Sequence, residues 1–325
     1  MRRREFIAGF GGAVAWPLAT RAQQPAMPVI GYVGTGDAAG GRLSVGGLHR
    51  GLMELGFVER GNIIVEYRWA EDRQERLPEL AADLVRRGVA VICTPSNVAT
   101  LAAKAATSHI PIVFVVGLDP VLMGIVSAID RPGGNATGVF FPTSALEPKR
   151  LELVRELLPG IPVVAALVNL DNPNARSHTK DLKAAASKLA LLMRILPARN
   201  LADIDTAFAI LVKEQIGALL VTSDPLFNAH RQRLVELAAR NAIPTVYPWR
   251  DFADAGGLVS YGNSLTDAVQ QVGIYAGRIL KGSKPGELPV WLPTKFEFVL
   301  NLRTAKALGV PVPLALQASA DEVIE

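Results

Sequence analysis

Pro28-Val-Ile-Gly-Tyr-Val33 is a short apolar run rich in β-forming residues, and a longer amphipathic stretch follows it as far as Leu55. The same pair recurs at once, because Ile63-Ile-Val-Glu-Tyr67 precedes a second helical stretch that ends near Arg87. Further runs of this kind, each followed within a few residues by a helical segment, occupy residues 89–94, 112–116, 163–168, 218–222 and 245–247. Continuous apolar strands separated by helices are typical of parallel sheets covered on both faces. The sequence therefore predicts an α/β protein.

The length of the chain predicts two lobes. A single hydrophobic core stops growing at about 250–300 residues, and this chain has 325 residues, of which 50% are hydrophobic. The alternation of strands and helices breaks in Pro- or Gly-containing segments at residues 140–144, 247–250 and 283–289. We interpret the breaks as three crossings between two Rossmann-like lobes. Lobe 1 is expected to span residues 28–141 and 251–283, and lobe 2 residues 145–247 and 287–325.

The first 22 residues have the layout of a removable signal peptide. A basic start is followed by an apolar stretch from Phe6 to Ala15, by Pro17 and by a small-residue exit. The apolar stretch is far shorter than the roughly 20 residues that a membrane-spanning helix needs. Arg3-Arg4-Glu5-Phe6-Ile7 also fits the twin-arginine pattern of export in the folded state. We expect cleavage after Ala22 and no direct membrane insertion of the mature chain.

The net charge does not indicate a nucleic-acid partner. The chain has 34 basic and 30 acidic residues, and residues 1–22 hold four arginines but only one acid, Glu5. The remaining chain therefore has 30 basic and 29 acidic residues. Binding to nucleic acid requires a clustered basic face, and no run of Lys and Arg after residue 22 resembles one.

Cysteine and histidine usage predicts neither a disulfide nor a metal site. Cys93 is the only cysteine, and its apolar surroundings favour a buried structural thiol over a reactive one. The four histidines are scattered, without ligand spacing, and no cofactor or metal is expected. No cysteine near the end of the signal could carry a lipid, so an exported, unanchored chain is expected in a Gram-negative periplasm.

Candidate binding residues follow the predicted strands, because parallel sheets place ligands outside the carboxyl ends of their strands. Ser96 and Asn97 open a helix whose free N–H groups and partial positive charge suit a ligand carboxylate. Asp224 suits a ligand ammonium group, and Tyr247, Trp249 and Tyr261 suit stacking on an aromatic or aliphatic portion. The candidate ligand-binding residues are Thr35, Ser96, Asn97, Asp119, Thr143, Asn169, Asp224, Tyr247 and Tyr261.

Structural roles explain several of these residues equally well. Ser96 is a favoured helix N-cap, and Asp119 and Asp224 each precede a proline at a helix start, where capping alone accounts for an aspartate. Large aromatic side chains belong to core or hinge packing as often as to ligand contacts. These alternatives stay open at the level of the sequence.

Several long motifs resemble one protein family. Residues 119–139 read DPVLMGIVSAIDRPGGNATGV, and similar agreement covers KRLELVRELLP from Lys149, AGGLVSYG from Ala255, LPTKFEFVLNLRTAKALG from Leu292 and ADEVIE at residues 320–325. Together they resemble the tryptophan/tyrosine-type family of ABC transporter substrate-binding proteins over nearly the whole mature chain. The resemblance implies the type I periplasmic-binding fold with a three-strand hinge, and delivery of a small ligand to an ABC permease in the inner membrane.

The function expected from the resemblance is capture of an amino acid or related small carboxylate in the cleft between the lobes, without enzymatic activity. An exported ligand-sensing partner of a membrane receptor would use the same fold. A Rossmann-type dehydrogenase is the enzymatic alternative, because Gly34-Thr-Gly36-Asp-Ala-Ala39-Gly40 nearly spells a dinucleotide-binding fingerprint. Its context is poor, since Gly40 and Gly41 extend the loop and the acidic residue expected about 20 positions later is displaced to Glu66.

Overall fold

Two separate β-sheets organise the chain. The computed structural model describes residues 27–325, so the predicted signal peptide lies outside the described residues. The first sheet is entirely parallel and has the order β2-β1-β3-β4-β5. Its strands are β1 (Val29–Gly34), β2 (Ile64–Trp69), β3 (Val91–Thr94), β4 (Ile112–Val116) and β5 (Ala136–Phe140).

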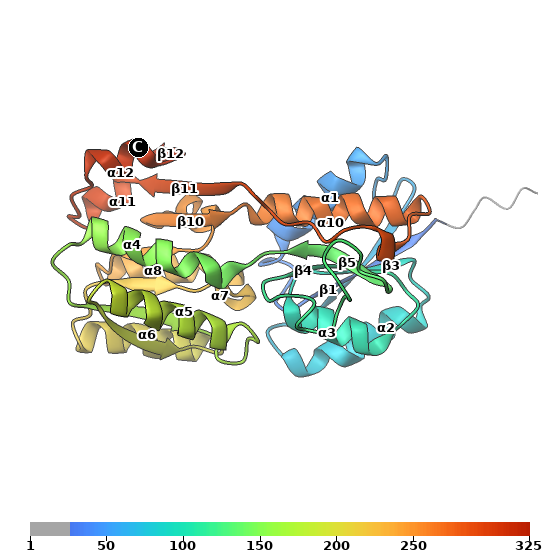
Figure 1. Ribbon diagram of the computed structural model, residues 1–325, viewed down its shortest axis with the longest axis horizontal. Coiled ribbons are helices and arrows are strands. Elements are labelled where there is room, and N and C mark those ends of the chain that lie inside the picture. The colour runs from blue at the N-terminus through green and yellow to red at the C-terminus, as the bar shows by residue number, and fades with distance from the viewer. Residues whose placement is uncertain (1–26) are drawn as a thin grey trace, which may run out of the picture.

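The second sheet has seven strands in the order β12-β11-β10-β9-β8-β6-β7. It is parallel except where β11 runs antiparallel to β10. Its strands are β6 (Val163–Val168), β7 (Leu192–Pro197), β8 (Leu219–Val221), β9 (Thr245–Tyr247), β10 (Val259–Asn263), β11 (Phe296–Asn301) and β12 (Glu322–Ile324). Figure 1 shows the two sheets in separate lobes that lie side by side along the long axis of the molecule. The predicted α/β class with two lobes of largely parallel strands is confirmed.

Helices cover both faces of the first sheet. Along β4, Val113 and Val115 share a buried cluster with α1 (Arg42–Glu54) and α10 (Leu265–Leu280). Ile112, Phe114 and Val116, which alternate with them, share another with α2 (Leu77–Arg86) and α3 (Asn97–Ala106). This alternation follows from the period of two along a strand. A short 3₁₀ turn, η1 (Gln74–Arg76), leads into α2.

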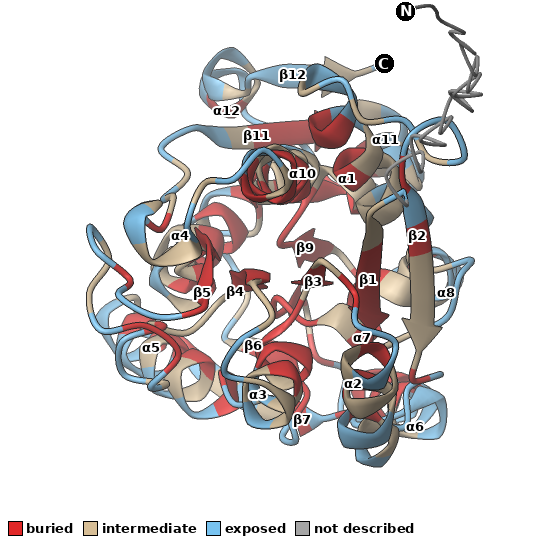
Figure 2. Cartoon of the chain, turned by 90° about the vertical axis from the view of Figure 1, so that its right-hand side faces the viewer, coloured by how far each residue is buried: buried red, intermediate tan, exposed pale blue. Residues whose placement is uncertain are grey.

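The second sheet is covered in the same way. One face packs against α4 (Glu147–Leu157), α5 (Ala175–Lys188), α11 (Leu302–Ala307) and α12 (Leu314–Ser319). The other packs against α6 (Leu201–Lys213), α8 (Arg231–Arg240) and α9 (Arg250–Asp254), and α7 (Pro225–Ala229) precedes α8. Figure 2 shows that buried residues concentrate on the strands and the inward sides of the helices.

The chain crosses between the lobes three times. The first crossing connects β5 to the 3₁₀ turn η2 (Thr143–Leu146) and lies within the predicted segment. The second lies between β10 and α10. The third follows η3 (Pro285–Glu287), after Val290 packs in the core of the first lobe and the Trp291 N–H donates to Gly138 O at 2.8 Å.

The predicted lobe boundaries are wrong at the second and third crossings. Residues 251–263 belong to lobe 2, because α9 packs on the second sheet and β10 pairs with both β9 and β11. Residues 287–291 stay with lobe 1, where they run beside β5. The physical reason is the same in both places. A Pro-containing segment marked the interruption of a helix or strand, but pairing in the sheet decided which lobe the next residues joined.

Candidate functional site

A pocket with a volume of about 120 Å³ lies between the lobes. Lobe 1 contributes segments that follow β1, β2, β3 and β4, and lobe 2 contributes segments that follow β6, β8 and β9. The pocket therefore lies at the carboxyl ends of parallel strands from both sheets, where α/β proteins bind ligands. The two walls differ in their chemistry.

The wall from lobe 1 contains an aromatic surface made by Tyr32 and Trp69, whose ring centroids are 5.2 Å apart. Gly34 and Gly41 make room for the indole. A Cβ atom at Gly34 would lie 2.3 Å from Trp69 Cζ3, and one at Gly41 would lie 2.2 Å from Trp69 Cη2. The glycines of this loop thus fit an indole inside the protein, and the resemblance to a dinucleotide-binding loop does not require a cofactor.

The same wall contains the amino terminus of α3. Ser96 caps the helix, because its Oγ accepts a hydrogen bond from Ala99 N at 3.3 Å. The N–H groups of Asn97 and Val98 have no intrahelical acceptor, as in the first turn of any α-helix. They add to the partial positive charge of the helix end and suit an anion. Ser96 and Asn97 are both buried at the pocket surface.

The wall from lobe 2 is made largely of polar side chains: Asn169, Asn172, Asn174, Arg199, Ser223, Asp224 and Asn228. Arg199 is exposed, and its Nε lies 3.3 Å from Asp203 Oδ2. Asp224 is 2% exposed, and its Oδ1 accepts from Leu226 N at 2.8 Å and from Asn169 Nδ2 at 3.3 Å. Its Oδ2 accepts from Asn172 Nδ2 at 2.6 Å. Burial raises the pKa of Asp224, and these hydrogen bonds offset part of that increase.

Within residues 27–325, Asp224 forms no salt bridge with a Lys, Arg or His side chain. A buried carboxylate held only by neutral donors is costly, and a cation beside it lowers that cost. The lobe 2 wall therefore suits a positively charged group of a ligand.

Two side-chain contacts connect the walls directly. Asn97 Nδ2 donates to Asn174 Oδ1 at 2.9 Å, and Asn97 Oδ1 accepts from Gly117 N at 2.9 Å. At another edge of the pocket, His230 Nε2 lies 2.8 Å from Asp72 Oδ2. Asn97, Gly117 and Asp72 belong to lobe 1, whereas Asn174 and His230 belong to lobe 2. The lobes are therefore in contact around the pocket, in a closed arrangement.

A buried ionic cluster supports the hinge beside the pocket. Glu147 and Arg150 are fully buried, with Glu147 Oε1 3.2 Å from Arg150 Nη1 and 2.6 Å from His178 Nδ1. Burial lowers the pKa of Arg150, and the neighbouring Glu147 carboxylate opposes that change. Arg150 Nε donates to Tyr261 O at 2.7 Å, which ties α4 to the strand that enters the second crossing. His178 Nε2 lies 3.4 Å from Oγ1 of Thr143, a pocket residue.

Six of the nine predicted binding residues line the pocket: Thr35, Ser96, Asn97, Thr143, Asn169 and Asp224. Ligand contact by these residues stays a prediction. Ser96 and Asp224 also cap helices, so the capping interpretation of both residues is correct as well.

The other three residues lie outside the pocket, so the structure does not bring them together with the six. Asp119 accepts from Val121 N at 2.8 Å and serves as a local cap. Tyr247 is buried against Phe252, with ring centroids 4.8 Å apart. The ring of Tyr261 stacks on Phe296 at 6.2 Å. Successive side chains along a strand point to opposite faces, so proximity to a strand end does not by itself direct a side chain into the cleft.

Many of the pocket residues were not predicted, among them Tyr32, Trp69, Asn174 and Asn228. The strand-exit rule would have found Trp69 if the predicted second strand had reached residue 69. Tyr32 lies inside β1, and Asn228 lies within α7, so neither follows a strand directly. Asn174 lies in the segment between β6 and α5. The candidates after this strand ended at Asn172, so the prediction stopped before Asn174.

The comparison with protein families decides the identification. Residues 37–324 match the family model described as ABC transporter substrate binding protein. The chain belongs to this ABC transporter substrate-binding family. A relative, the tyrosine-binding protein of Clostridioides difficile (strain R20291), is 26% identical over 264 residues, which cover 81% of this chain and 76% of the relative.

Solved structures share the fold of this family member. A conserved domain protein from Vibrio cholerae has a TM-score of 0.82 and 24% identity, with 91% of this chain and 99% of that chain covered. An ABC domain from Streptococcus pneumoniae in complex with L-Trp has a TM-score of 0.81 and 23% identity over the same shares of each chain. The predicted type I periplasmic-binding fold is therefore confirmed.

Three further features of this substrate-binding protein are its cysteine, its potential metal ligands and the length of its helices. Burial raises the pKa of the Cys93 thiol to about 12, so Cys93 is a structural thiol, as predicted. No group of three or more His, Cys, Asp or Glu side chains in residues 27–325 is placed to hold a metal ion. None of the helices in this range has the length and apolar character needed to cross a membrane.

Proposed function

We propose that the protein is the exported binding component of an ABC importer and that it captures an amino acid or a related small carboxylate between its lobes. The observation that carries the proposal is the opposition of two charges in one pocket. The amino terminus of α3 lies on one wall, and the buried carboxylate of Asp224 lies on the other.

A zwitterion complements this arrangement. Its carboxylate would accept from the free N–H groups at the start of α3, and its ammonium group would approach Asp224. The aromatic surface of Tyr32 and Trp69 would contact an apolar part of the ligand. The two relatives whose descriptions mention tyrosine and L-Trp support an amino acid as the ligand class. None of these contacts performs a reaction, and the protein is proposed to bind rather than to catalyse.

Export of the chain to the periplasm is supported by the sequence of residues 1–22. There the protein would deliver its ligand to a permease of the inner membrane, in keeping with its family. Replacing Arg3 and Arg4 by Lys should leave the precursor in the cytoplasm. Normal export of that variant would contradict the twin-arginine assignment.

A thermal-shift screen of residues 23–325 tests the ligand class. A ligand present at 100 times its Kd stabilises the folded state by about 2.7 kcal/mol, which raises Tm by roughly 4 °C in a protein of this size. Amino acids, aromatic acids, short-chain carboxylates, nucleosides and sugars make up the panel. We expect the largest shift from an amino acid. Shifts produced only by nucleosides or sugars would overturn the proposal.

A further inference from the structure

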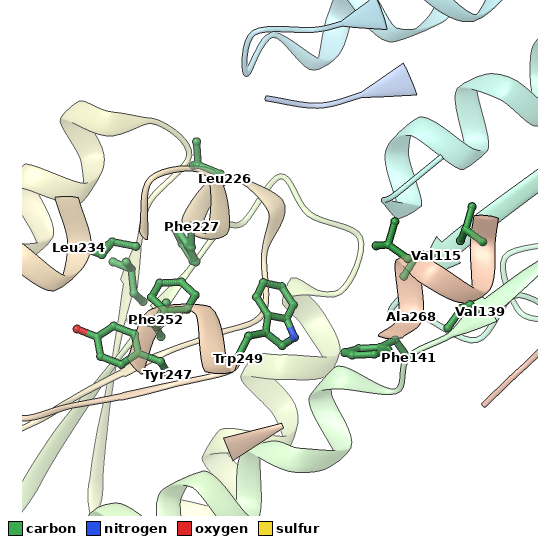
Figure 3. Close-up of a cluster of buried hydrophobic side chains, with 14 of the residues drawn as sticks. Val115, Val139, Phe141, Leu226, Phe227, Leu234, Tyr247, Trp249, Phe252 and Ala268 are labelled. Carbon is green, nitrogen blue, oxygen red and sulfur yellow. The ribbon is translucent and has the colours of Figure 1, made fainter. Parts of the chain in front are cut away.

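The hinge side of the pocket is lined largely by apolar side chains, and one hydrogen-bond donor among them has no partner within residues 27–325. Val115 and Phe141 line it from the first lobe and the first crossing, and Leu265 lines it from the start of α10. Trp249, which follows β9 in lobe 2, completes this end of the pocket and is 6% exposed. Figure 3 shows the indole nitrogen of Trp249 on the ring edge that faces Phe141, away from Tyr247 and Phe252.

The donor in question is Nε1 of Trp249. This atom is buried and has no hydrogen-bond partner within residues 27–325. An indole N–H can only donate, and buried polar groups in proteins almost always have a partner. Tyr247, two residues earlier, lies outside the pocket and packs against Phe252. Trp249 thus directs an unpaired, buried donor toward Phe141, another residue that lines the pocket (Figure 3). The aromatic stacking predicted for Trp249 from the sequence does not use this atom.

We propose that Trp249 determines specificity: its Nε1–H donates to an oxygen at the hinge-side end of the ligand. This inference rests on the proposed function and narrows the ligand class. The ligand would carry an apolar or aromatic side chain that ends in an oxygen acceptor, such as a hydroxyl or phenol group. A plain hydrocarbon side chain would cover the indole N–H without pairing with it. Sites built to bind a ligand hydroxyl reject the analogue without that hydroxyl, because their own polar group is left unpaired.

Matched ligand pairs test this inference by isothermal titration calorimetry on residues 23–325. The pairs are L-tyrosine with L-phenylalanine, L-threonine with L-valine, and 4-hydroxyphenylacetate with phenylacetate. We expect the oxygen-bearing member of the best-bound pair to bind at least tenfold more tightly. In Trp249→Phe, which keeps an aromatic ring but removes the donor, the preference should fall to less than about threefold.

Tyr247→Phe is the matched control, because it removes a polar group from the same segment but outside the pocket. In this variant, the preference for the oxygen-bearing member of the pair should equal that of the wild type. Equal affinities of the wild type for both members of each bound pair would overturn the inference, whether or not Trp249→Phe folds. A preference that persists unchanged in folded Trp249→Phe would do so too. If no compound in any pair binds but another amino acid produces a thermal shift, the inference is overturned and the proposed function stands. If no amino acid or small carboxylate produces a thermal shift, the proposed function is contradicted, and the inference with it.

Discussion

The two walls of the pocket recognise a ligand by different means. Lobe 1 offers an aromatic surface, glycine backbone, the end of a helix and the exposed carboxylates of Asp37 and Asp72. Lobe 2 offers five neutral polar side chains, one buried carboxylate and the exposed Arg199, which is paired with Asp203. The group that is most costly to bury therefore lies in lobe 2, where Asp224 is desolvated and forms no salt bridge within residues 27–325. A ligand favours the closed form through contacts with both walls.

Removing the charge of Asp224 should have the largest effect on binding. We expect Asp224→Asn to weaken binding of the ammonium-bearing ligand at least 30-fold, since breaking a buried charged pair costs about 2–5 kcal/mol. The ligand-free protein should be as stable as the wild type or more so, because Asn still caps α7 and no longer requires a buried charge. Calorimetry and thermal unfolding measure the two effects.

Asp119→Asn is the control for this substitution, because Asp119 also caps a local turn but lies outside the pocket. Its ligand affinity should match that of the wild type. A ligand affinity of Asp224→Asn within threefold of the wild-type value would show that the polar wall does not receive a cation.

Acidification should reproduce the effect of removing the charge. The pKa of Asp224 is raised in the folded protein above its ordinary value of 3.8, so the carboxyl becomes neutral at a higher pH than in the unfolded chain. Ligand affinity should therefore fall as the pH decreases through this raised pKa, beginning above pH 3.8.

Stability of the ligand-free protein should change in the opposite direction. The raised pKa of Asp224 favours the folded state below the unfolded-state value, and this contribution is lost as the pH rises through the folded-state pKa. In Asp224→Asn, the pH dependence of ligand affinity and the pH dependence of stability should both be weaker than in the wild type. Calorimetric titrations and thermal unfolding across the acidic pH range, on both proteins, give the comparison. Identical profiles of the two proteins would assign the pH dependence to another group.

Removing an aromatic side chain from the lobe 1 wall should have an intermediate effect on ligand affinity. We expect Trp69→Ala to weaken binding of a ligand with an apolar side chain about tenfold, because loss of a contact with a large aromatic ring costs about 1.5 kcal/mol. Tyr67→Phe is a suitable control, since Tyr67 packs beside Trp69 but does not line the pocket. An unchanged affinity of Trp69→Ala would mean that the ligand does not reach this wall.

Breaking the contact between Asp72 and His230 should have the smallest effect on ligand binding. Both side chains are partly exposed, and exposed ion pairs contribute about 0.2–1 kcal/mol. Asp72→Asn should therefore increase the rate of ligand dissociation by less than about fivefold, which stopped-flow fluorescence can measure. Asp205→Asn breaks an ion pair with Arg233 away from the pocket and should leave the rate unchanged. A larger effect of Asp72→Asn would make this contact a principal determinant of closure.

The sequence was most informative where one local pattern determined the structure. The apolar run at residues 112–116 is β4, as predicted, and α2 ends at Arg86, next to the predicted end near Arg87, because apolar periodicity acts locally. Strand β7 was not predicted. It lies at the edge of the second sheet, and its half-exposed residues lack the continuous apolar character of the central strands.

The site was less predictable because tertiary contacts place its residues. Asn174 reaches the pocket only because α5 begins opposite α3, where Asn97 binds it. Tyr261 follows the same strand-exit reasoning as Asp224, yet its ring packs against Phe296 of the antiparallel strand β11, which the sequence pattern did not indicate. The ends of the predicted strands indicated where the cleft lies. The direction of each side chain could not be predicted, because it depends on the order of the strands in the sheet.

A crystal structure of residues 23–325 with the amino acid that produces the largest thermal shift would show which group of the ligand each wall of the pocket binds. We predict that the ligand lies between the walls, with its carboxylate at the first N–H groups of α3 and its ammonium group beside Asp224. A ligand that contacts only one lobe, or that places no cationic group near Asp224, would contradict this account.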